Sequence, residues 1–176
     1  PQMAIGQGPI EWTLVQAAGA YAILARGGVV HPTFIKTQGG SELSPGYLKL
    51  DPRGIELALE GMRLSATDRN GTTSVLRLPE LREPIFNIPD VEIYAKSGTA
   101  QAPPLRINIK DQQGIEDKRI VREGNHGWVI CLVKRPQSIQ PDFVIAVIVE
   151  YGGSGGQVGG PIVNQILHAM RSCEYL

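Results

Sequence analysis

The stretch VEIYAKSGTAQ, residues 91–101, decides the fold class. Apolar Val91, Ile93 and Ala95 alternate with more polar neighbours, which is the period of two that a half-buried β-strand shows. The hexapeptide KSGTAQ, residues 96–101, follows this predicted strand directly. The sequence therefore predicts a strand that leads into a run of side chains able to do chemistry.

Two later runs extend the sheet. Residues 128–133 and 143–150 are short, apolar and rich in β-branched residues, as strands are. A connection with Pro136 and Pro141 separates them, and it has no helical pattern. We expect these two runs to form an antiparallel pair.

Helices flank the predicted strands. Thr13 can cap a helix over residues 13–26, and Asp51 can cap a second helix that ends near Ser65. A last amphipathic helix is expected to begin at Pro161. Strands in succession without helices between them predict an α+β fold, an antiparallel sheet covered by helices, in one domain.

Three segments are expected outside the regular elements. Residues 79–90 contain three prolines and are predicted to be irregular surface, and residues 102–124 are polar and predicted to be a long excursion between strands. Residues 152–160 are rich in glycine but lack a G-x-G-x-x-G or a Gly-Lys-Ser/Thr motif. We interpret this third segment as a flexible connection and not as a phosphate-binding loop.

Composition narrows the function classes. Lysine plus arginine equals aspartate plus glutamate at 17 each, so there is no net charge to attract nucleic acid. Cys131 and Cys173 lack metal-site or disulfide-framework spacing, and His31, His126 and His168 stand far apart without companion ligands. The sequence predicts no metal, no cofactor and no nucleic-acid partner.

The hexapeptide carries the chemistry. Strand alternation places Lys96 and Gly98 on one side and Ser97 and Thr99 on the other, on an edge that a ligand could approach. Glycine leaves room for a ligand backbone. Read alone, so short a motif also fits an exposed strand end with a solvated lysine.

Other segments match a known family in the same order. Besides KSGTAQ, they are IGQG at 5–8, EGMR at 60–63, NHGWV at 125–129, with glycine where alanine is usual, and EYGG at 150–153. Together they resemble the transpeptidase domain of class B penicillin-binding proteins over nearly the whole chain. The motif of lysine, serine or threonine, and glycine is the third of that fold's set, after S-x-x-K and S-x-N.

The resemblance implies a peptidoglycan D,D-transpeptidase that works through an acyl-serine. It implies that Lys96 contributes positive charge beside the S-x-N serine, and that Ser97, Gly98 and Thr99 bind the substrate. The Thr99 backbone N–H would form half of the oxyanion hole. The implied ligands are the peptidoglycan stem peptide and β-lactams. The implied place is the outer face of the bacterial cytoplasmic membrane, reached through an amino-terminal anchor that this chain lacks.

The nucleophile is not among these residues. No serine in the chain has lysine three residues later, and none begins S-x-N. We therefore expect residues 1–176 to be the carboxy-terminal part of one transpeptidase domain, inactive alone, that needs the amino-terminal part of the same domain as its partner. Two alternatives stay open: a non-catalytic penicillin-binding-like domain that acts in envelope assembly by protein contact, and a fragment of a serine β-lactamase.

Overall fold

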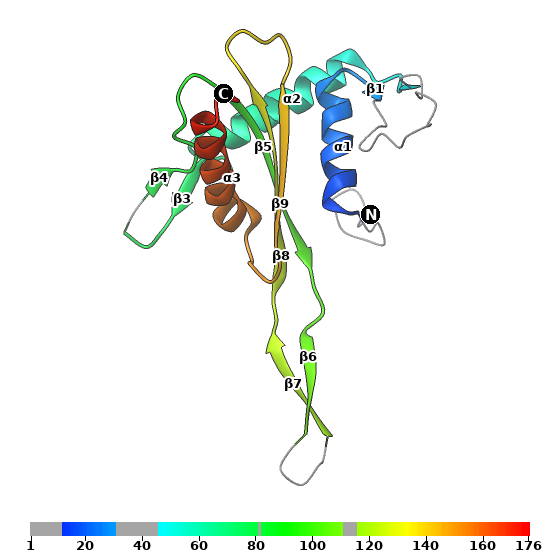
Figure 1. Cartoon of the computed structure of the whole chain (residues 1–176), viewed down its shortest axis with the longest axis vertical. Helices are drawn as coiled ribbons and strands as arrows, with labels where there is room; N and C mark the ends of the chain where they lie inside the picture. The colour runs from blue at the N-terminus through cyan, green and yellow to red at the C-terminus, as the bar shows by residue number, and fades with distance from the viewer. Residues whose placement is uncertain (1–11, 31–45, 81, 111–115) are drawn as a thin grey trace.

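A three-stranded antiparallel sheet forms the centre of the protein. The computed structural model describes residues 12–30, 46–80, 82–110 and 116–176. The sheet has the order β5 (Glu92–Gln101), β8 (Asn125–Lys134) and β9 (Phe143–Val149), and it lies at the centre of the molecule in Figure 1. In its register Lys96 lies opposite Ile130, and Cys131 lies opposite Ile145. The predicted α+β class and the antiparallel pair are confirmed.

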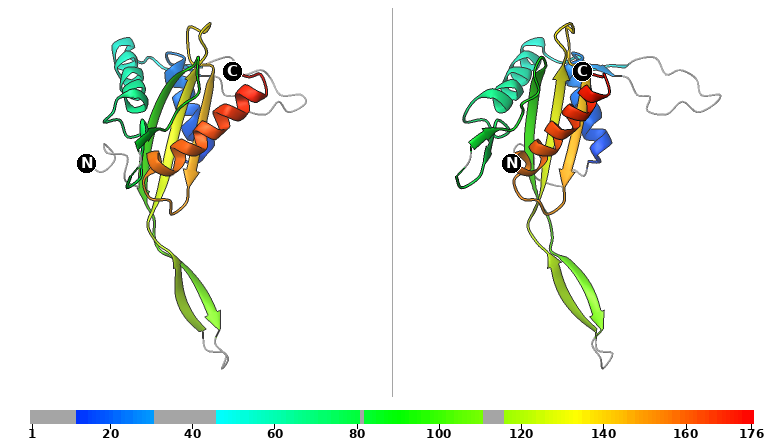
Figure 2. Two further views of the ribbon diagram at one scale, coloured as in Figure 1. Left: turned by 90° about the vertical axis from the view of Figure 1, so that its left-hand side faces the viewer. Right: turned by 60° about the vertical axis from the view of Figure 1, so that its left-hand side comes forward.

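Within the described residues, three helices cover this sheet: α1 (Leu14–Ala25), α2 (Pro52–Thr67) and α3 (Gly155–Ser172). Helices α1 and α3 lie on opposite faces, each over its own apolar core, as Figures 1 and 2 show. Helix α2 contributes Met62 to the α1 core and Ala66 to the α3 core, so it lies beside β5 where the two cores meet. The core side chains are mainly the alternating residues of the strands, because successive strand positions face opposite sides.

Both predicted amino-terminal caps are confirmed. The Gln16 N–H donates to Thr13 Oγ1 over 3.2 Å, and the Thr13 N–H donates to Gln16 Oε1 over 2.9 Å, which is a capping box. The Gly54 N–H donates to Asp51 Oδ2 over 2.8 Å. Helix α2 ends two residues later than predicted, at Thr67.

The glycine-rich segment is not a flexible connection, and this prediction was wrong. Residues 155–160 form the first turns of α3, which begins at Gly155 and not at Pro161. Gly155, Gly156, Gly159 and Gly160 are all buried. Glycine is a weak helix former, but it allows a helix to approach a sheet more closely than any other residue does.

The polar excursion between the strands is itself regular structure, which corrects the second prediction. Strands β6 (Leu105–Lys110) and β7 (Glu116–Arg122) pair antiparallel, with a register shift after Leu105. Every residue of both strands is exposed, and the pair projects from the body in Figure 1. The hairpin thus prolongs β5 and β8 beyond the sheet.

The segment before β5 also contributes to the core, so the prediction of irregular surface was wrong there. Strands β3 (Val75–Arg77) and β4 (Arg82–Pro84) form a small antiparallel pair. Thr73, Ile85 and Ile88 are buried around it.

A last pair, β1 (Val29–Val30) with β2 (Gly46–Tyr47), lies near the end of α1. The amino-terminal IGQG and His31 fall outside the described residues.

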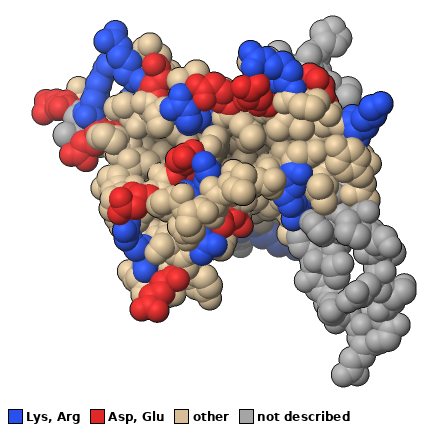
Figure 3. All heavy atoms as spheres, turned by 90° about the horizontal axis from the view of Figure 1, so that it is seen from above, with Lys and Arg blue, Asp and Glu red and all other residues tan. Residues whose placement is uncertain are grey.

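Charges of both signs are mixed on the surface. Figure 3 shows acidic and basic side chains interspersed on one face, consistent with the zero formal net charge. In the described part of the chain, no helix combines the length and the apolar character needed to cross a membrane. Nor do three metal-ligating side chains gather anywhere among the described residues.

Candidate active site

The sequence motif lies within β5, on the outer edge of the sheet. Residues 96–101 form the second half of this strand, where we had expected them just after a strand. Strand β8 pairs with one edge of β5, and no described strand pairs with the other. An extended ligand could therefore lie along that unpaired edge.

The motif side chains alternate between the two faces as predicted. Tyr94 packs toward the core under α1, so Lys96 continues on that face. Ala95 packs toward the core under α3, so Ser97 and Thr99 continue on that face. Thr99 lies opposite Gly127 of β8. The strand thus presents an ammonium on one side and two hydroxyls on the other.

The Lys96 ammonium folds back along its own strand. Its Nζ donates to the Ser97 carbonyl oxygen over 2.7 Å, and the residue is exposed. This hydrogen bond holds the positive charge close to the strand backbone, within reach of an anionic group at the edge.

Ser97 has a partner that the sequence analysis missed. Its Oγ lies 2.7 Å from Thr72 Oγ1, in the turn that follows α2. Residues 67–73 have the composition of a turn and carry no motif that would connect them with the site. The adjacent hydroxyls of Thr72 and Thr73 after Asn70 and Gly71 were the available signal, but only the fold shows which strand they meet.

Gly98 is not required by packing inside this chain. A Cβ built there would meet only the Trp128 Cβ, at 3.5 Å, which is an ordinary contact. Gly155 differs, because its Cβ would collide with the carbonyl oxygens of both Trp128 and Gly98. The start of α3 therefore supports the strand backbone behind Gly98, and among the described residues only the Trp128 Cβ lies within 4 Å of a Cβ placed there.

His126, at the start of β8, makes a structural contact. Its Nδ1 accepts a hydrogen bond from the Tyr151 N–H over 3.0 Å, and the two rings meet edge-on with centroids 4.8 Å apart. Tyr151 Oη in turn donates to the Pro103 carbonyl over 3.1 Å. These contacts link the end of β9 to the base of the hairpin.

The EGMR segment on α2 is also structural. Arg63 donates to both carboxylate oxygens of Glu60, over 2.8 and 2.7 Å, and this hydrogen bonding lowers the pKa of Glu60. Met62 packs in the core beside Leu132. Met62 thus packs α2 against the sheet, while Arg63 and Glu60 pair with each other on the same helix.

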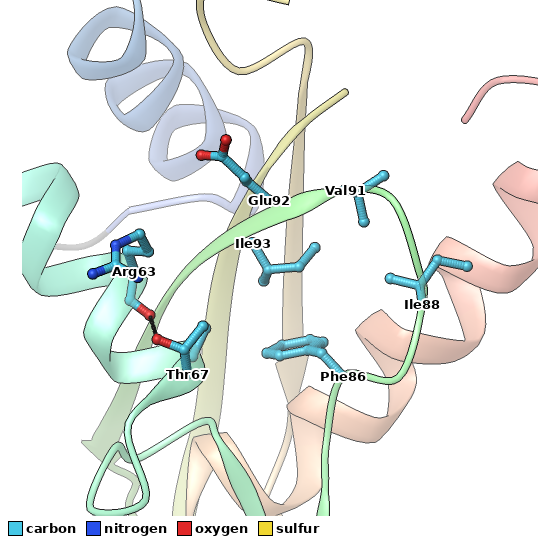
Figure 4. A pocket seen from close by; sticks show the side chains of 8 residues that line it. Arg63, Thr67, Phe86, Ile88, Val91, Glu92 and Ile93 are labelled. Atoms are coloured by element: carbon cyan, nitrogen blue, oxygen red, sulfur yellow. Dashed lines mark hydrogen bonds between the residues drawn. The ribbon is translucent and has the colours of Figure 1, made fainter. Parts of the chain in front are cut away.

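A pocket of about 240 Å³ lies at the other end of β5, shown in Figure 4. Phe86, Ile88, Val91 and Ile93 are four of its eight lining residues, and Arg63 stands at its α2 side. Because the motif begins only further along the strand, the pocket is not part of the candidate site. The candidate site is therefore the edge of β5 at residues 96–101 and not this cavity.

Glu92, which lines the pocket, forms a hydrogen bond with Tyr94 and an ion pair with Lys134. The Tyr94 hydroxyl donates to Glu92 Oε2 over 2.6 Å, and Lys134 Nζ donates to Glu92 Oε1 over 3.0 Å. Burial and the bond to Glu92 raise the pKa of Tyr94 to about 12, and the bonds from Tyr94 and Lys134 lower the pKa of Glu92. Both groups lie on β5 before the motif begins at Lys96.

Fold and site together define an α+β protein with an edge strand that carries lysine, two hydroxyls and glycine. The family model of the penicillin binding protein transpeptidase domain matches residues 1–168. The chain belongs to the penicillin-binding protein transpeptidase family, whose domains act in the cell envelope.

One solved structure supports the family and the fold. It is Pseudomonas aeruginosa PBP2 in complex with WCK 5153, which is 26% identical, with a TM-score of 0.61 over 95% of this chain. The match covers 32% of that protein, so the present chain spans about a third of its length. The search of curated proteins found no match.

Proposed function

We propose that this chain forms the lysine-strand side of a peptidoglycan D,D-transpeptidase site, with a nucleophilic serine supplied by residues outside the printed sequence. The family supports acyl transfer through serine, and no serine here has lysine three residues on. The observation that carries the proposal is the second half of β5: in the part of the chain that the structure describes, no strand pairs with its outer edge, and Gly98 leaves room there for a ligand.

The proposed reaction has two steps. The serine oxygen attacks the carbonyl between the two terminal D-alanines of a stem peptide, the peptide bond breaks, and the last D-alanine leaves with a proton on its nitrogen. An amine of a neighbouring strand then attacks the ester, and the serine regains its proton. β-Lactams acylate the same serine but are not released quickly.

Each motif residue has a role in this scheme. Ser97 and Thr99 donate hydrogen bonds to the substrate's terminal carboxylate, and Lys96 adds positive charge beside it. The Thr99 N–H stabilises the oxyanion that forms as the carbonyl is attacked, which lowers the barrier most where water is excluded. Gly98 allows the substrate backbone to lie against the strand.

The same proposal places the protein on the outer face of the cytoplasmic membrane, held by an amino-terminal anchor. The amino-terminal part of the transpeptidase domain is its partner, and this chain by itself is inactive. The complex of the similar PBP2 with WCK 5153 supports the binding of a small ligand at the completed site, and β-lactams are the ligands that we propose for it.

Labelling with a fluorescent penicillin tests the proposal. The intact protein should be labelled, residues 1–176 alone should not, and Lys96→Ala in the intact protein should slow labelling by about 100-fold, as loss of an electrostatic stabiliser does. Lys118→Ala is the matched control, because this exposed lysine lies on β7 away from the motif. It removes the same charge and should label at the wild-type rate.

Two results would count against the proposal. An intact, folded protein that takes no label would refute the catalytic claim and favour the non-catalytic envelope domain. Equal rates for the Lys96 and Lys118 variants would remove the role given to Lys96.

A further inference from the structure

We propose that Thr72 is a positioning residue for Ser97, which it holds and polarises so that Ser97 can donate to an anionic ligand group. This inference rests on the proposed function, since it assigns Ser97 a carboxylate. It starts from the 2.7 Å contact between Ser97 Oγ and Thr72 Oγ1, two residues 25 apart in the sequence.

The backbone at Thr72 is fixed from two sides. The neighbouring Thr73 N–H donates to the Ser65 carbonyl on α2 over 3.1 Å. On the other side, a Cβ on Gly156 of α3 would collide with the Thr72 carbonyl oxygen, so helix α3 and this turn are in close contact. Thr72 is therefore a rigid support for whatever its hydroxyl touches.

The hydroxyl protons can be assigned by counting. Thr73 Oγ1 donates its only proton to the Ser65 carbonyl over 2.8 Å, so in its 3.1 Å contact with Ser65 Oγ it must accept. Ser65 has then used its own proton, and Thr72 donates in the 3.3 Å contact with Ser65 Oγ. Ser97 in turn donates to Thr72. With this assignment, each hydroxyl in the series Ser97, Thr72, Ser65 and Thr73 donates to the next, and the last donates to the Ser65 carbonyl.

A carboxylate bound at Ser97 changes the direction of only two of these hydroxyl protons, those of Ser97 and Thr72. Ser97 turns its proton to the ligand, and Thr72 turns its own proton to Ser97. Thr72 thereby exchanges the long 3.3 Å contact for the short 2.7 Å one, so the reversal loses little. Donation from Thr72 also polarises the Ser97 hydroxyl and makes it a better donor. A valine at position 72 can do neither, whereas a serine can do both.

The test compares Thr72→Val and Thr72→Ser in the intact protein. The measured quantity is the second-order rate constant of acylation by a penicillin and by its methyl ester, which lacks the carboxylate charge. Thr72→Val should slow reaction with the free acid by about five-fold, because Ser97 loses the hydrogen bond from Thr72 while it donates to a charged carboxylate. Reaction with the ester should slow by less than about two-fold. Thr72→Ser should retain the wild-type rate with both.

An equal loss with acid and ester would mean a general structural effect and would overturn the inference. If the wild-type protein reacts with neither compound, the proposed function fails. The positioning role of Thr72 can then still be tested by the position of the Ser97 side chain. Crystal structures should then show the Ser97 side chain in a new or split rotamer in Thr72→Val and in its original rotamer in Thr72→Ser. An unchanged Ser97 in Thr72→Val would refute the positioning role.

Discussion

Replacement of Gly155 by alanine should destabilise the protein, because the start of α3 rests on the sheet backbone. A Cβ at this position would collide with the carbonyl oxygens of Trp128 and Gly98 and would lie 2.8 Å from the Trp128 nitrogen. These are backbone atoms of the β5 and β8 pair, which cannot turn away as a side chain can. The helix must move instead, and the contacts of its first turns with the sheet would loosen.

The magnitude follows from two opposing effects. Overpacking a close contact costs about 1–3 kcal/mol, and three backbone atoms place this site near the upper end. The better helix propensity of alanine returns up to about 1 kcal/mol. The net loss is about 2 kcal/mol, which lowers the melting temperature by about 4–8 °C for a chain of this size.

Gly61→Ala provides the matched control. Gly61 lies within α2, and its Cβ would have nothing within 4 Å, so only helix propensity changes. This variant should be more stable than wild type by about 0.5–1 kcal/mol. Thermal and urea unfolding followed by circular dichroism measure both. If Gly155→Ala proves as stable as Gly61→Ala, the close packing of α3 on the sheet is refuted.

Three further predictions concern separate sites. Gly98→Ala should change the free energy of unfolding by less than about 1 kcal/mol but slow penicillin acylation by at least about ten-fold, because the added methyl group displaces the ligand and not the protein; a large loss of stability in urea unfolding would contradict this. Hydrogen bonds from Arg135 lower the pKa of Asp142 to about 2, so its contribution is complete above the unfolded pKa near ~4 and is lost as pH falls through about 2. Wild type should therefore exceed Asp142→Asn in stability at pH 7 and lose that advantage near pH 2, and a pH-independent difference would contradict the assignment. Cys131 is fully buried, and burial raises the pKa of its thiol, whereas Cys173 is exposed; a thiol reagent should modify Cys173 in the native protein and Cys131 only after unfolding, and rapid native labelling of Cys131 would count against its place in the core.

Features fixed by neighbouring residues were predictable from the sequence. Thr13 and Asp51 cap helices through hydrogen bonds that span three residues, so the sequence itself contains both partners. Strand β5 was predictable from its alternation of apolar and polar residues, and strands β8 and β9 were predictable from their short apolar runs rich in β-branched residues. The α+β class followed from their order.

Features fixed by the fold as a whole were not predictable. Composition suggested a loop at residues 152–160, because the reason for the glycines is a contact with β5, β8 and Thr72 that the sequence does not display. The β6–β7 hairpin was not predicted, although Leu105, Ile107 and Ile109 alternate as strand residues do. Its many charged residues made the segment look polar and irregular when it was judged by composition.

The site shows the same division. Lys96, Ser97, Gly98 and Thr99 could be proposed as site residues from the sequence because they are consecutive on one strand. Thr72 was missed because a turn after a helix meets that strand only in the folded chain. Long-range contacts of this kind leave no local periodicity to detect.

The most direct test of the central claim is to locate the residue that penicillin acylates. The intact protein would be treated with penicillin, digested, and the modified peptide identified by mass spectrometry. The account predicts one penicilloyl group on a serine outside residues 1–176, lost or strongly reduced in Lys96→Ala. A modified serine within residues 1–176, or no modification of the folded protein, would contradict it.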